Sequence, residues 1–166
     1  QTFSTSIARS AWTNRFCAPT PEDVIDGIHP LPRLAFARAR QMLAALDEEF
    51  IWQGVWKWSF VYTRAVGPWC AAAFLIPDPI KPRMCIPLDK MAVAKLTCKP
   101  LSPLVRAALC NCPIIENTRW PSWVLSEPSA VEEILGSLFM RSSVQSHRVK
   151  GDKNKLCVLL PGQNQT

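Results

Sequence analysis

The sequence is poor in glycine and histidine and lacks the glycine-rich patterns that bind nucleotides or present a catalytic serine. Only six of the 166 residues are glycine and two are histidine. It contains no G-x-G-x-x-G loop, no Walker phosphate loop and no G-x-S-x-G nucleophile turn, each of which needs glycine where the backbone turns sharply or approaches a ligand. The sequence therefore gives no support to a dinucleotide-binding, P-loop or α/β-hydrolase enzyme.

A long apolar run is also missing. The longest uncharged apolar stretch covers residues 65–77 and is interrupted by Gly67 and Pro68. A membrane-spanning helix needs roughly 18 or more such residues, so we expect a buried strand here and no membrane association. The first residues, QTFSTSIARSAWTNR, lack the charged and apolar regions of a signal peptide, and we expect a cytoplasmic protein.

The seven cysteines form no disulfide framework or zinc-binding pattern. Their odd number and the expected cytoplasmic location favour reduced thiols. Cys110 and Cys112 could chelate zinc with Cys98, His29 or His147, but structural zinc sites use C-x₂₋₄-C pairs with a matching second pair. Both thiols also fall at the negative end of a predicted helix, which opposes a nucleophilic thiolate. We predict no metal and no other cofactor.

The net charge of +6 is concentrated near the two ends of the chain. Two arginines lie in the first 20 residues, and five basic residues against one acidic residue lie beyond residue 140. The rest carries twelve basic and twelve acidic side chains, so we predict no nucleic-acid partner, which would need basic residues gathered on one face. We expect a flexible N-terminal arm at residues 1–19, a core domain at residues 20–141 and a basic C-terminal tail at residues 142–166.

The spacing of apolar residues predicts an α+β fold. Apolar residues recur with helical spacing in some segments, and they alternate or run continuously in others, as they do in strands. We expect a single domain with a mostly antiparallel sheet and helices packed on one side. The predicted helices cover residues 21–26, 32–49, 89–96, 103–109 and 127–140, and the predicted strands cover residues 55–64, 69–77, 83–88 and 118–125.

The order of these elements resembles the YdhG-like group of small bacterial domains of unknown function. The patterns that carry the resemblance are PTPEDV, KWSFVY, AAFLI, MCIPL, SPLVRAAL and TRWPSWVLSEPSAVEEILGSLFMR, and they extend over about residues 20–141. The resemblance implies an α+β protein with helices against a mostly antiparallel sheet. It carries over no catalytic residue.

The sequence is rich in tryptophan, with seven residues. Alternate residues of the strand VWKWSFVYTR place its aromatic rings on one face, and the next strand sets small alanines beside them. These rings either fill the core or leave a recess, whose edge Arg119 or Arg64 would make favourable for an acidic group. The candidate ligand-binding residues are Trp56, Trp58, Tyr62, Trp69, Arg119, Trp120 and Trp123.

We therefore expect a binding or interaction module with an aromatic-lined pocket or a self-association surface. Its expected partners are a small apolar or aromatic ligand or a second copy in a homodimer. The alternative is a small enzyme acting on an apolar or aromatic substrate in that cleft, which would need a titratable group with a shifted pKa. Tyr62, Asp89 and Glu116 are the candidates for that group. No nucleophile is paired with a base, so the sequence favours binding over catalysis.

Overall fold

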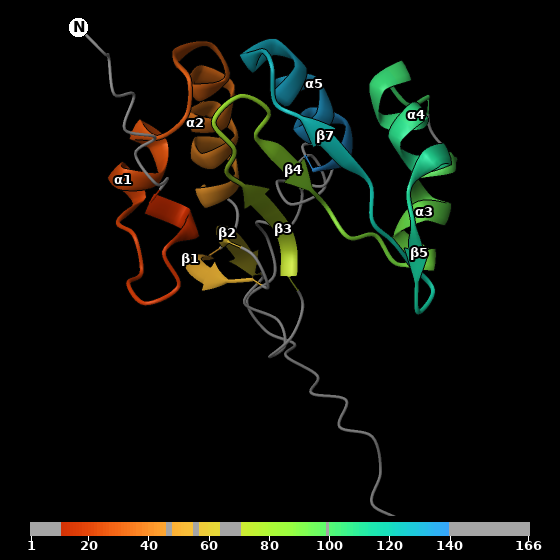
Figure 1. Ribbon diagram of the computed structural model, residues 1–166. Coiled ribbons are helices and arrows are strands. Elements are labelled where there is room, and N and C mark those ends of the chain that lie inside the picture. Colours follow the sequence, from red (N-terminus) through yellow and green to blue (C-terminus); the bar gives the residue numbers. More distant parts are fainter. Residues whose placement is uncertain (1–10, 46–47, 55–56, 64–70, 99, 140–166) are drawn as a thin grey trace, which may run out of the picture.

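The protein contains a five-stranded antiparallel sheet with helices packed on one face (Figure 1), which confirms the predicted α+β class. The computed structural model describes residues 11–45, 48–54, 57–63, 71–98 and 100–139. The strand order is β1-β2-β3-β4-β7, and every neighbouring pair is antiparallel. The strands are β1 (Glu48–Gln53), β2 (Trp58–Thr63), β3 (Ala71–Ile76), β4 (Arg83–Cys85) and β7 (Ser122–Val124).

Side-chain caps and prolines fix where several helices begin. Thr20, Asp89 and Ser102 each accept a hydrogen bond from the backbone N–H three residues later, which satisfies a free donor of the first turn. The last helix has no such cap, because its N-cap residue, Glu127, makes no side-chain cap hydrogen bond. The helices are α1 (Pro21–Asp26), α2 (Pro30–Ala44), α3 (Lys90–Thr97), α4 (Pro103–Asn111) and α5 (Pro128–Leu138).

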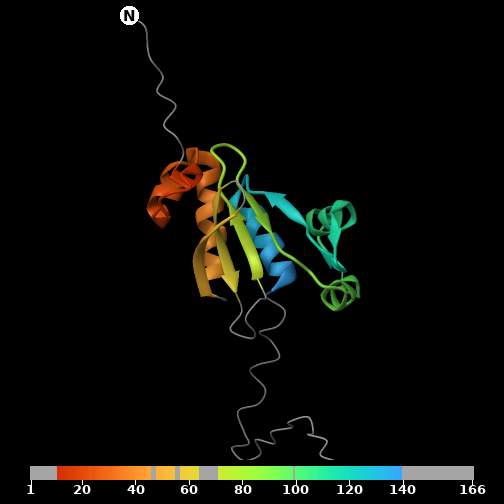
Figure 2. The ribbon, with the colours of Figure 1, turned by 60° about the horizontal axis from the view of Figure 1, so that its bottom comes forward.

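Helices α2 and α5 lie side by side against the same face of the sheet (Figures 1 and 2). An ion pair joins them, with Arg38 Nε 2.7 Å from Glu132 Oε1. The antiparallel register carries one row of core side chains across the sheet beneath these helices. The row consists of Ile51, Phe60, Leu75, Met84 and Trp123, all of which belong to or pack against the hydrophobic core.

The core includes residues that precede the boundary expected at residue 20. Trp12, in the short 3-10 helix Ala11–Thr13, is 1% exposed and belongs to the core cluster. Its ring lies against Gly27, where an added Cβ would overlap it. The arm predicted over residues 1–19 is therefore too long. Residues 1–10 and 140–166, which include the predicted basic tail, lie outside the described residues.

The elements α3, α4 and a two-stranded hairpin lie together beside β7, at one end of the molecule (Figure 1). The hairpin pairs β5 (Ile114–Ile115) with β6 (Thr118–Arg119). Its turn residues Glu116 and Asn117 have φ values of 49° and 65°, in the left-handed region. The single strand predicted at residues 118–125 is thus two short strands, because Pro121 cannot donate a ladder hydrogen bond.

None of the helices in the described ranges combines the length and apolar character that crossing a membrane requires.

Candidate functional site

The predicted site residues divide between the two faces of the sheet. Trp58, Tyr62 and Trp123 lie on the face that packs against the helices. Tyr62 is 0% exposed and Trp123 is 6% exposed, so both rings are part of the core. Trp58 is half-buried, and its indole Nε1 donates a hydrogen bond of 2.7 Å to the carbonyl oxygen of Asn14. Trp56 and Trp69 lie outside the described residues.

Side chains of α2 cover the predicted aromatic row. The Phe36 ring lies 5.9 Å from the Phe60 ring, and the Arg40 guanidinium lies over Phe60 at 5.0 Å from its centroid. The small side chain expected beside the aromatics is present, since Ala73 pairs with Tyr62 and is fully buried. This part of the structure has the character of a filled core.

A polar cluster that the sequence did not predict surrounds Tyr62. Its hydroxyl donates a hydrogen bond of 2.7 Å to Glu49 Oε2. The Arg40 guanidinium donates to both oxygens of the same carboxylate at 2.8 to 3.1 Å. Burial, followed by the hydrogen bond to Glu49 and its negative charge, raises the pKa of Tyr62, and the hydrogen bond to Glu49 raises the pKa of Arg40. The cluster holds Tyr62 protonated and connects α2 to β1.

The three candidates for an enzymatic group have different environments. Tyr62 is buried in the sheet with a raised pKa, which opposes its use as a base near neutral pH. Asp89 accepts a hydrogen bond of 2.7 Å from the backbone N–H of Ala92 and caps α3. Glu116 is exposed in the hairpin turn. The three residues belong to separate elements and form no common site.

The cysteines of the described ranges also lack a shared chemical role. Burial raises the pKa of the Cys85 thiol to about 11, so this thiol is protonated at neutral pH. Cys110 is exposed, and Cys112 Sγ donates to the carbonyl oxygen of Leu109 at 3.3 Å. Within the part of the chain that the structure describes, no three or more His, Cys, Asp or Glu side chains are grouped to hold a metal ion.

Arg119 is held by hydrogen bonds within the fold. Its Nη1 donates a hydrogen bond of 3.0 Å to the carbonyl oxygen of Leu109, at the end of α4. Its backbone exchanges two hydrogen bonds of 2.8 Å with Leu88. Arg119 therefore connects the hairpin to α4 and to the segment after β4.

The other face of the sheet carries a series of aromatic side chains that contact one another, and the sequence did not predict this group. Trp52 of β1 contacts Phe74 of β3 at 6.5 Å between ring centroids, and Phe74 contacts Trp120 at 6.0 Å. We call these three residues the aromatic ridge, and we call the face the open face. Phe50 and Trp52 are 44% and 49% exposed. This face presents large apolar side chains to solvent.

Two charged residues lie on the open face on either side of the aromatic ridge. Glu48 pairs with Thr63 at one end of β1, and Arg83 pairs with Ile76 and Val124 toward the opposite end of the strands. Both are exposed, and neither has an ion-pair partner among the residues that the structure describes. Arg83 Nη2 donates a hydrogen bond of 2.9 Å to Ser122 Oγ.

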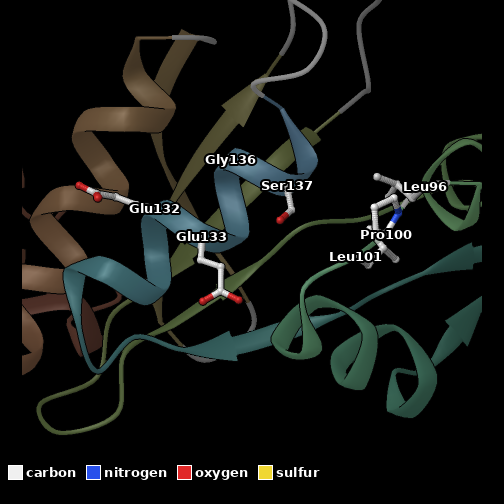
Figure 3. A pocket seen from close by; sticks show the side chains of 7 residues that line it. All are labelled: Leu96, Pro100, Leu101, Glu132, Glu133, Gly136 and Ser137. Atoms are coloured by element: carbon white, nitrogen blue, oxygen red, sulfur yellow. The ribbon is translucent and has the colours of Figure 1, made fainter.

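Two cavities of moderate size are present among the described residues. One, of about 300 Å³, separates α5 from the segment that joins α3 to α4, with Glu133 and Ser137 on one wall and Leu96, Pro100 and Leu101 on the other (Figure 3). The second, of about 200 Å³, is lined by side chains of α1, α2 and β1. Its lining residues are Ile25, Ala37, Arg40, Gln41, Ala44 and Glu49.

Comparison with known proteins finds no matching family model, no similar curated protein and no similar solved structure. The resemblance to the YdhG-like group stays a prediction.

Proposed function

We propose that this protein is a binding module whose working surface is the open face of its sheet. The aromatic ridge is the observation that carries the proposal. Trp52, Phe74 and Trp120 form a continuous series of ring contacts on a face where Phe50 and Trp52 are about half exposed. Contiguous exposed apolar surface is typical of interaction sites, and aromatic residues are enriched in their centres.

The shape of this surface favours a protein partner over a small ligand. Small-molecule sites are concave and enclose most of the ligand surface. The open face instead displays side chains at the regular spacing of a sheet, and neither cavity described above is lined by a side chain of that face. An apolar surface of another protein chain matches it better.

The enzyme alternative has less support. A general base needs a pKa near the operating pH, whereas burial and Glu49 raise the pKa of Tyr62. Glu49 already accepts hydrogen bonds from Arg40 and Tyr62, so its lone pairs are engaged in the fold.

The test is site-specific photo-crosslinking in cells that produce the full chain. A photoreactive phenylalanine analogue replaces Phe50 in one variant and Leu34 in a matched control, since Leu34 is an exposed apolar residue of α2. We expect irradiation to join position 50, but not position 34, to a specific protein chain. Absence of adducts at position 50, or equal labelling at both positions, would contradict the proposal.

A further inference from the structure

We infer that two copies of this chain bind each other through their open faces about a two-fold axis, with Glu48 of each copy opposite Arg83 of the other. This inference rests on the proposed function and names its partner. It depends on three features of the open face: the line of the aromatic ridge, the positions of Glu48 and Arg83, and the absence of an ion pair at either residue among the described ranges.

The strand register gives the ridge its direction. Trp52 of β1 lies in the same cross-strand row of paired residues as Ile76 of β3 and Arg83 of β4. Phe74 lies in the next row on this face, two residues along β3 from Ile76. Trp120 precedes β7 and continues the displacement in the same direction. The ridge therefore crosses the open face diagonally, from the edge at β1 to the side of β7.

The two charges lie on opposite sides of this diagonal. Glu48 is at the other end of β1 from Trp52, and Arg83 is in the row of Trp52 but on β4. With strands about 4.8 Å apart and about 3.3 Å of rise per residue, each charged residue lies on the order of 10 Å from the ridge. Rotation by 180° about an axis along the ridge brings Glu48 of one copy close to Arg83 of the other.

A two-fold interface must be self-complementary, because the same patch is present on both sides. The open face meets this requirement in two ways. Rings along the axis meet the same rings of the other copy, which buries their exposed apolar surface. Among the described residues of the face, Glu48 and Arg83 lie at related positions, so two opposite-charge contacts form between the copies.

Charge reversal with measurement of dimerisation tests the inference. Sedimentation velocity over a concentration series of the purified full chain gives the dimer Kd for wild type, Glu48→Arg, Arg83→Glu and the double variant. Because the two-fold axis repeats each contact, each single reversal creates two like-charge contacts in the dimer, and we expect the dimer Kd to rise about tenfold. The double reversal restores opposite charges, and we expect its Kd to lie within about threefold of wild type.

Two variants on other elements control for net charge. Glu133→Arg on α5 and Arg106→Glu on α4 make the same charge changes at exposed positions away from the open face, and we expect neither to change the Kd. A chain that is monomeric at every concentration overturns the inference. So does a dimer that either single reversal leaves unchanged, as in pairing through the β1 edge, or a double variant that stays as weak as the single variants.

The outcomes also separate this inference from the proposed function. Adducts at position 50 that contain only a different protein, together with a monomeric purified chain, overturn the second copy as partner and leave the binding module intact. Absence of any adduct at position 50 overturns the proposed function itself.

Discussion

Two tryptophans three residues apart have opposite hydrogen-bonding environments. Trp123 Nε1 donates to the carbonyl oxygen of Leu104 at 3.2 Å. Trp120 Nε1 is buried and has no hydrogen-bond partner among the described residues. A buried donor without a partner costs free energy of folding, whereas a satisfied donor contributes modestly to stability.

These environments predict different effects of replacing each indole with a phenyl ring. Trp123→Phe leaves the Leu104 carbonyl without its donor and reduces core volume, so we expect a loss of about 2 kcal/mol in the free energy of unfolding. Trp120→Phe removes the unpaired N–H and keeps a ring beside Phe74, and we expect a change within about 0.5 kcal/mol. Urea denaturation measures both. Equal losses would contradict the assignment of the two indoles.

Tyr62 is the only tyrosine of the chain, so its titration can be observed directly by ultraviolet absorbance. Its pKa is raised in the folded state, by burial first and then by Glu49. The folded state therefore holds the phenolic proton more tightly than the unfolded state, whose tyrosine pKa is about 10. This contribution is fully present below about pH 10 and decreases as pH rises above it.

We expect wild-type stability to decrease above about pH 10 more steeply than that of Tyr62→Phe. At neutral pH the variant loses a hydrogen bond to a charged acceptor and is expected to be less stable by about 1 to 2 kcal/mol. Cys85, whose pKa is raised to about 11, gives a decrease of the same sign in both proteins and cancels in the comparison. Tyrosinate absorbance in the folded protein near pH 10 would contradict the buried cluster.

At the scale of single elements, replacement of glycine by alanine is expected to have opposite effects on stability at two positions. Gly136 lies inside α5, and an added Cβ meets nothing within 4 Å. Gly136→Ala should therefore stabilise the protein by about 0.5 to 1 kcal/mol through helix propensity. At Gly27 the Cβ would overlap the Trp12 ring, so Gly27→Ala should destabilise it by about 1 to 3 kcal/mol. Thermal unfolding of both variants would measure these effects, and a stabilising Gly27→Ala would show that Trp12 does not pack there.

Periodicity and capping signals predicted most elements, and tertiary contacts determine where the prediction failed. The helix expected over residues 32–49 ends at Ala44, and Glu48 and Glu49 begin β1 instead. In the strand, Glu49 faces the core and binds Arg40 of α2 and Tyr62 of β2, and these contacts between three elements are not encoded in local sequence patterns.

The sequence predicted only part of the candidate site, because tertiary contacts decide which side chains come together. Alternation correctly placed Trp58 and Tyr62 on one side of their strand, but it does not reveal which side the helices cover. The sequence analysis assigned Trp120 and Trp123 to one site, but residues three apart along a strand lie on opposite faces, and the two rings do face opposite sides of the sheet. The ridge residues Trp52 and Phe74 lie on strands that are not neighbours, so only the folded sheet brings them together.

At the scale of the whole molecule, the two faces of the sheet differ in exposure, because helices cover one face and half-exposed aromatic side chains lie on the other. Phe60 is buried beneath α2, whereas Trp52 is about half exposed on the open face. The same kind of substitution should therefore have different consequences on the two faces. A core aromatic replaced by alanine costs about 3 to 5 kcal/mol, while an exposed position in a strand costs about 1 kcal/mol or less.

We expect Phe60→Ala to lower the free energy of unfolding by about 3 to 5 kcal/mol at every protein concentration. Trp52→Thr, which keeps a strand-compatible side chain, should cost about 1 kcal/mol or less at low concentration, where the chain is monomeric. Association of folded copies raises the apparent Tm with concentration, so the wild type should show this rise and Trp52→Thr should not. Thermal unfolding over a hundredfold range of concentration measures both effects. A core-sized loss in dilute Trp52→Thr would mean that the ridge stabilises the monomer, because its rings would then be part of the core and not a surface for a partner.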